Sequence, residues 1–198
     1  QKAYEYVDRA LELDPDHANT RFLIAHTSWL NKWDWATAER EFLKAIAANP
    51  NDVWTRMWYA HLLGCLQRHD EALAQAQLAS DLDPLNPFLQ TMFSVVLTNA
   101  GDCEAGMLVL EKVLAIEPEN FIANVILFGV AYRCGDYDKV MVGEKHILKV
   151  YSRGELEEDD FKEIERIYNE QGFPAAYEEG LRLWEYLANK GYVFPGDL

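Results

Sequence analysis

Residues 79–84 read ASDLDP, and a similar phrase closed by proline occurs about one helical hairpin away on either side. It reads AIAANP at 45–50 and VLAIEP at 113–118, and a fourth copy, ALELDP, covers 10–15. The closing prolines are separated by 35, 34 and 34 residues. A fixed period of this length indicates an array of structural repeats rather than a single irregular domain.

A stripe of small and apolar residues precedes each proline. Its members recur in steps of four and three, which places them on one face of a helix. Small side chains on that face let a second helix approach closely, and the proline then ends the helix. The stripe consists of Ala3, Val7 and Ala10, then Ala38, Phe42 and Ala45, then Ala72, Ala76 and Ala79, then Gly106, Leu110 and Val113.

The segment between one proline and the next stripe has room for one more helix and a turn. Two consecutive units carry a glycine at the same turn position, Gly101 and Gly135. Glycine adopts a positive φ at little cost and commonly ends a helix. We therefore expect a unit of helix, turn, helix and proline. The first full unit has one extra residue, which we place in its turn NKWDW at 31–35.

This pattern resembles the tetratricopeptide repeat (TPR), a 34-residue helical pair with small residues at the helix contact and a closing proline. The resemblance implies an all-α fold, a right-handed superhelical solenoid of antiparallel helix pairs. It covers residues 1–152. We expect a half repeat at 1–17, repeats at 18–52, 53–86 and 87–120, and a degenerate repeat at 121–152, in which Val140, Glu144 and Ile147 occupy the small-residue positions.

Residues 153–198 depart from the repeat and predict an irregular, truncated C-terminal helical pair. Phe161, Ile164 and Ile167 stand at helical spacing, and Gly172 begins the turn to the second helix. The acidic run ELEEDD at 155–160 precedes the first helix. Acids in that place usually complement the helix dipole on a solvated face, and the alternative is an acidic docking patch.

A second resemblance concerns KWDWATAEREFLKAIAANP at 32–50 together with the segment that begins GFPAAYEEG at 172. These are similar to C-terminal repeat arrays of bacterial regulatory proteins, which follow winged-helix, cyclase or kinase domains. That resemblance implies an intramolecular regulatory or sensor domain of a larger transcriptional or signalling protein. Because the chain begins with Gln, we expect a fragment or a processed product.

Charge and composition exclude several functions. Of 198 residues 49% are apolar, which supplies a core, and 33 acids against 18 bases give a net charge of −15. Nucleic acids and anionic membrane surfaces bind basic proteins, so we expect neither as a partner. No apolar run is long enough for a membrane span. The three cysteines, Cys65, Cys103 and Cys134, form no CxxC pair, and this odd, sparse set argues against a disulfide scaffold or a zinc module and predicts a reducing, cytoplasmic location.

The sequence carries no signature of catalysis, and we expect neither an enzyme nor a cofactor. It lacks GxGxxG, GxxxxGK[ST], HExxH and GxSxG motifs. His26 and His61 stand one repeat apart, and normal helix packing separates them by about 10 Å. That is too far to share a metal ion, so we expect no metal site and interpret both as half-buried polar residues, with a metal site or pH switch as the alternative.

The first helices of TPR-like pairs line the concave side of a solenoid. Ile24 and Ala25, Tyr59 and Ala60, and Phe93 and Ser94 are expected to face the second helix of their own pair. The opposite stripe then forms the predicted partner-binding groove. Counted in steps of three and four, it contains Asn19, Phe22, His26, Trp29, Trp54, Met57, His61, Cys65, Phe88, Thr91, Val95, Asn99, Ile122, Val125, Tyr132 and Arg133.

The predicted groove is apolar and aromatic, and only Asn99 and Arg133 could contribute to the basic and asparagine clamp with which some TPR domains hold a carboxylate tail. We therefore expect a protein-interaction module that binds an apolar peptide or a partner helix. Two alternatives are that the aromatic residues pack between neighbouring first helices, or that another part of the parent chain covers them. Self-association through the uncapped ends is a further expectation, since Tyr4, Tyr6 and Val7 would lack a neighbouring helix.

Overall fold

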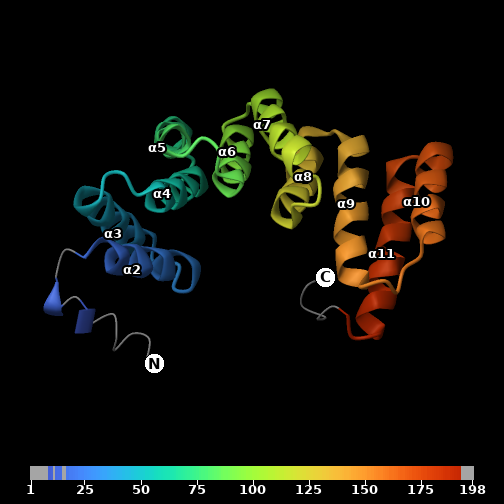
Figure 1. The fold of residues 1–198 in the computed structure, drawn as a ribbon, viewed down its shortest axis with the longest axis horizontal. Coiled ribbons are helices and arrows are strands. Elements are labelled where there is room, and N and C mark those ends of the chain that lie inside the picture. The colour runs from blue at the N-terminus through green and yellow to red at the C-terminus, as the bar shows by residue number, and fades with distance from the viewer. Residues whose placement is uncertain (1–8, 11, 15–16, 193–198) are drawn as a thin grey trace. The chain divides into compact units, whose positions relative to one another are not determined.

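The structure is a computed structural model that describes residues 9–10, 12–14 and 17–192. Most of the expected half repeat at 1–17, including Tyr4, Tyr6 and Val7, lies outside the described residues, and so do residues 193–198 of the C-terminal segment. Figure 1 shows the order of the helices along the chain.

The described residues are all-α, as predicted. They contain ten helices packed as sequential antiparallel pairs. The helices are α2 (Ala18–Leu30), α3 (Trp35–Ala48), α4 (Val53–Cys65), α5 (His69–Leu82), α6 (Pro87–Asn99), α7 (Cys103–Ile116), α8 (Phe121–Cys134), α9 (Tyr137–Ser152), α10 (Glu158–Gln171) and α11 (Phe173–Asn189).

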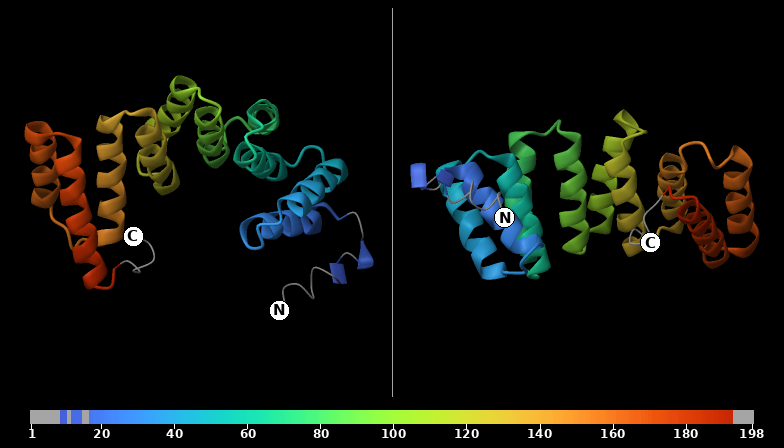
Figure 2. Two further views of the ribbon diagram at one scale, coloured as in Figure 1. Left: turned by 180° about the vertical axis from the view of Figure 1, so that it is seen from behind. Right: turned by 90° about the horizontal axis from the view of Figure 1, so that it is seen from below.

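The chain forms two compact units, Gln1–Val109 and Leu110–Leu198, and the division falls within α7. In the first unit α2 packs on α3 and α4 on α5, and the first helices α2, α4 and α6 also contact in sequence. In the second unit α8 packs on α9, and α11 packs on both α9 and α10. The two views of Figure 2 show these pairs from behind and from below.

Local sequence signals set the helix ends. Asp34, Asp52 and Asn86 cap the N-termini of α3, α4 and α6 by accepting hydrogen bonds from backbone N–H groups of the first turn. Gly101 and Gly135 have φ values of 97° and 74°, as the turn pattern predicted. The linker from α2 to α3 has one residue more than that from α4 to α5, which confirms the extra residue at 31–35.

Three helices end two residues before a repeat proline. α3 ends at Ala48, α5 at Leu82 and α7 at Ile116. Proline disfavours the helical conformation in the residue before it and has no N–H to donate, so each helix stops short of it. The spacing of the prolines therefore determines where each pair ends.

Small residues lie at the contact between the two helices of a pair. Ala25 and Ala38, and Ala60 and Ala72, are at most 1% exposed and belong to one buried cluster of the first unit. In the third pair Gly106 takes the equivalent place, and a Cβ added there would lie 2.8 Å from the carbonyl oxygen of Ser94. The helices thus approach as closely as their backbones allow.

Two polar links add to these contacts. Within the first pair, Glu41 is 4% exposed and accepts a 2.7 Å hydrogen bond from Arg21 of α2. Burial alone would raise the pKa of Glu41, but hydrogen bonds from Lys44, Arg21 and Arg40 outweigh it and lower the pKa. Between pairs, the Tyr59 hydroxyl donates to Glu39 at 3.0 Å, so α4 is hydrogen-bonded to α3.

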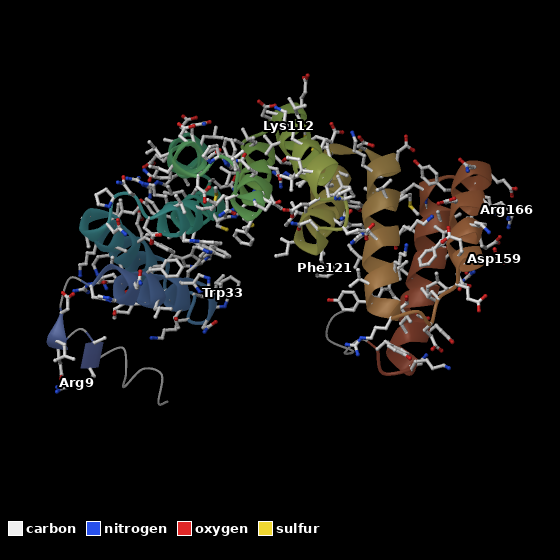
Figure 3. The ribbon with its side chains drawn as sticks, in the orientation of Figure 1. Arg9, Trp33, Lys112, Phe121, Asp159 and Arg166 are labelled. Carbon is white, nitrogen blue, oxygen red and sulfur yellow. The ribbon has the colours of Figure 1, made fainter. Side chains whose placement is uncertain are left out.

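The acidic run at 155–160 acts as a helix start. Asp160 accepts a 2.8 Å hydrogen bond from the backbone N–H of Glu157, just before α10 begins. Glu158 and Asp159 lie in the first turn and are exposed. Figure 3 shows Asp159 and Arg166 on the outer side of α10. This arrangement is that of a solvated, dipole-complementing helix terminus.

Replacing Ala60 by Leu tests the register of the repeats. Ala60 is fully buried, so the larger side chain would overpack the helix contact and lower the free energy of unfolding by about 1–3 kcal/mol. Ala74→Leu is the control, because Ala74 is an exposed residue of α5. Urea melts followed by circular dichroism measure both variants, and equal stabilities would show that the register is wrong.

Candidate functional site

Aromatic side chains fill the space between successive first helices of the first unit. The Trp58 ring of α4 meets His26 of α2 edge-on, with ring centroids 4.9 Å apart, and lies 6.0 Å from His61 of its own helix. Trp29 also contacts Trp58, at 6.2 Å. One helix further on, Trp54 of α4 lies 5.0 Å from Phe88 of α6. Packing between first helices, one of the two alternatives to a groove role, therefore accounts for part of these side chains.

The sixteen predicted groove residues divide into three groups by exposure. Asn19, Trp54, Cys65, Ile122, Val125, Tyr132 and Arg133 are exposed. Phe22, His26, His61, Phe88, Val95 and Asn99 are half-buried. Trp29, Met57 and Thr91 are buried, at 8%, 1% and 1% exposure, so their prediction as groove residues is wrong.

The error at Met57 recurs at Thr91, which occupies the same position one repeat later, whereas Trp29 lies two turns further along its own helix. The predicted stripe on α4 runs from Trp54 through Met57 to His61 and Cys65, in steps of three and four residues. An alternative stripe runs from Trp54 through Trp58 to the same His61 and Cys65, in steps of four, three and four residues. The side chain of Trp58 is only half-buried. Both sets of residues follow a helical face. The set with Trp58 stays at the surface, because Met57 is buried in the core and Trp58 is not.

The same one-residue shift of the stripe replaces Thr91 by the half-buried Met92 in α6. In α2 it replaces Phe22 and Trp29 by the exposed Leu23 and Leu30. We call the corrected set the first-helix stripe. Its twelve residues contain no Lys, Arg, Asp or Glu. It comprises Asn19, Leu23, His26 and Leu30 of α2, Trp54, Trp58, His61 and Cys65 of α4, and Phe88, Met92, Val95 and Asn99 of α6.

His61 is the most perturbed polar residue of the stripe. Burial lowers its pKa to about 4, and a hydrogen bond to the backbone of Met92 opposes this only in part. Its Nε2 atom is buried and has no hydrogen-bond partner. Burial also lowers the pKa of His26. Both rings are therefore neutral at pH 7, and the stripe carries no charge there.

The second unit holds the remaining predicted residues, with a different arrangement. Ile122 and Val125 are 45% and 37% exposed on α8. Tyr132, 56% exposed at the end of α8, belongs to a cluster in which Tyr137 and Phe173 stack with ring centroids 4.4 Å apart. Tyr137 and Phe173 were not among the predicted residues, because they come from α9 and α11 rather than from a first helix.

The described part of the chain contains neither a cluster of metal ligands nor a membrane-spanning helix. Residues 9–10, 12–14 and 17–192 contain no group of three or more His, Cys, Asp or Glu side chains placed to hold a metal ion. Within the same residues, no helix is both long enough and apolar enough to cross a bilayer.

The cysteines correct one expectation. Cys65 is an exposed free thiol, whereas Cys103 and Cys134 are disulfide-bonded. The bonded state of Cys103 and Cys134 is contrary to the reduced thiols that this odd, sparse set of cysteines led us to expect. The cytoplasmic location that was inferred from that set remains a prediction.

Solved structures share this fold over most of the chain. PilW, a widely conserved type IV pilus biogenesis factor, matches with a TM-score of 0.70 and 21% identity over 98% of this chain and 87% of that one. PilF of Pseudomonas aeruginosa matches with a TM-score of 0.67 and 18% identity over 93% and 83% of the two chains. YrrB, a TPR protein with an unusual peptide-binding site, has a TM-score of 0.57 and 13% identity over 93% and 96%.

These likenesses establish the TPR fold, as the repeat pattern predicted. The sequence matches no protein-family model and no curated protein. Stacked helical pairs of this fold offer extended surfaces along the array.

Burial of His61 predicts a pH-dependent stability. The unfolded chain binds a proton on His61 below pH 6.5, but the folded chain does so only near pH 4. Stability is therefore lost as the pH falls through this window. From pH 7.5 to pH 5 the loss due to His61 is about 2 kcal/mol. Urea melts of the parent and of His61→Gln at both pH values measure it, and parallel pH profiles would contradict the assignment.

Proposed function

We propose that the chain is a protein-interaction module that binds an apolar peptide or a partner helix on the first-helix stripe. The observation that carries the proposal is that this stripe is uncharged over three successive first helices, α2, α4 and α6, in a chain with a net charge of −15. Charged side chains are depleted at the centres of protein interfaces, and aromatic residues are enriched there.

Trp54 is the residue best placed to contact a ligand. It is 42% exposed and is held by its contact with Phe88, so little conformational freedom would be lost on binding. Covering the exposed part of a tryptophan is worth about 2 kcal/mol. Trp58 next to it is half-buried between His26 and Trp29 and would form the floor under the same ligand.

A peptide selection tests the proposal. Peptides selected from a random library on the immobilised protein should carry apolar residues at helical or alternating spacing. Trp54→Ala should weaken the selected peptides about tenfold or more. The matched control is Trp33→Ala, because Trp33 is 70% exposed in the turn before α3 and lies outside the stripe (Figure 3). Equal losses in the two variants, or none in either, would remove the stripe as the binding surface.

Met57→Ala is expected to behave differently from Trp54→Ala. Met57 is 1% exposed and belongs to the core of the first unit, so its truncation leaves a cavity. The expected cost is about 2–5 kcal/mol of unfolding free energy. Trp54→Ala should cost less, and thermal melts of the two variants compare them. A Met57→Ala variant that melts at the parent's temperature would contradict the core assignment.

A further inference from the structure

A cavity of about 260 Å³ lies between α9 and α10 in the second unit. α11 packs against both of these helices (Figure 2). The residues that line the cavity come from α9 and α10. Its walls include Met141 and Val142 of α9 and Phe161 and Ile164 of α10. This apolar lining would receive a hydrocarbon chain a few carbons long.

Glu144 is also part of the cavity wall and is an unusual residue to find there. It is 3% exposed, and its Oε2 atom has no hydrogen-bond partner. On its other side the carboxyl group lies against Gly180 of α11, where an added Cβ would be 3.0 Å from the carboxyl carbon. An unpaired buried carboxylate costs several kcal/mol, on the order of the stability of a whole small domain, unless it is protonated or meets a cation.

Comparison with Glu41 shows what Glu144 lacks. Both are glutamates in the second helix of a pair, and both are at most 4% exposed. Three cationic side chains bond to Glu41 and lower its pKa. No charged group offsets burial at Glu144, and burial raises its pKa to about 7. The fold therefore keeps a carboxyl group in its interior without providing its counter-ion.

The other charges around the cavity do not supply that counter-ion. Lys145 is the one base in the wall, and it already bonds to Glu165 at 2.7 Å. Asp138 accepts a hydrogen bond from the Tyr168 hydroxyl. Around the cavity three carboxyl groups, Asp138, Glu144 and Glu165, thus stand against one ammonium group, while Gly180 presents only backbone on the α11 side.

We propose that this cavity binds a primary ammonium group carried on an apolar stem, with Glu144 as the hydrogen-bond acceptor and counter-ion. An anion would meet an excess of negative charge, and a wholly apolar molecule would leave Oε2 of Glu144 without a donor. An alkylammonium ion satisfies both the apolar walls and the carboxylate. The chemistry is shared by a small free amine and by the lysine side chain of a protein partner.

The pH dependence of binding follows from the titration of Glu144. The ligand is a cation, so it binds the ionised carboxylate. With a pKa of about 7, the ionised fraction of Glu144 rises about tenfold between pH 6 and pH 8. An alkylammonium remains protonated throughout this range, so its affinity should rise about tenfold as well.

Titration calorimetry with n-pentylammonium chloride tests the proposal, with 1-pentanol as the neutral analogue. We expect saturable binding at one site of the full chain, tighter at pH 8 than at pH 6, and weak or absent binding of the alcohol. Glu144→Gln should reduce the affinity at pH 8 about tenfold or more and abolish its pH dependence. Glu163→Gln is the matched control, because Glu163 is an exposed residue of α10 that does not line the cavity.

A second probe, Nα-acetyl-lysine methylamide, distinguishes the two sources of the ammonium group. Binding as tight as that of pentylammonium supports a lysine side chain, and binding of pentylammonium alone supports a free amine. The proposal fails if neither probe saturates, if pentanol binds equally well, or if Glu144→Gln binds like the parent. Glu144→Gln should fold, because the glutamine amide has the shape of the carboxyl group and no buried acid remains. Circular dichroism checks the fold of this variant.

Discussion

The close approach of the two helices within each pair is the contact on which the rest of the structure depends. Ala25 with Ala38, Ala60 with Ala72, and Ser94 with Gly106 leave almost no side-chain volume at that contact. Because one face of each first helix is held there, the remaining faces are available to neighbouring first helices and to solvent. The first-helix stripe exists because the small residues fix the rotation of α2, α4 and α6.

Much of this could be read from the sequence, because the signals are local. The proline period, the small-residue stripe and the turn glycines each depend on residues close together in the chain, and they located the helix pairs. The surface stripe was harder, since Met57 and Trp58 both continue a helical step from Trp54. Choosing between them requires the rotation of the helix. The disulfide state of Cys103 and Cys134 depends on tertiary structure and had no sequence signal.

The second unit uses the same architecture with different chemistry. At the position where earlier pairs place Phe42 or Ala76, α9 carries Glu144, a departure that was visible in the sequence as decay of the repeat. The helix approach there is kept by glycine: a Cβ at Gly143 would lie 2.9 Å from the backbone nitrogen of Phe128. Room for a buried carboxyl group is made by Gly180 on α11. The loss of the repeat pattern thus created a polar group that a simple scaffold does not need.

The most direct test of the central claim, that the uncharged first-helix stripe is the binding surface, is an NMR titration of the tryptophan indole N–H signals with a selected apolar peptide. The six tryptophans sample distinct parts of the chain. We predict that the signals of Trp54 and Trp58 shift on binding, while those of Trp33, Trp35 and Trp184 remain in place. Shifts confined to Trp33, Trp35 or Trp184 would contradict the account and place the partner elsewhere on the molecule.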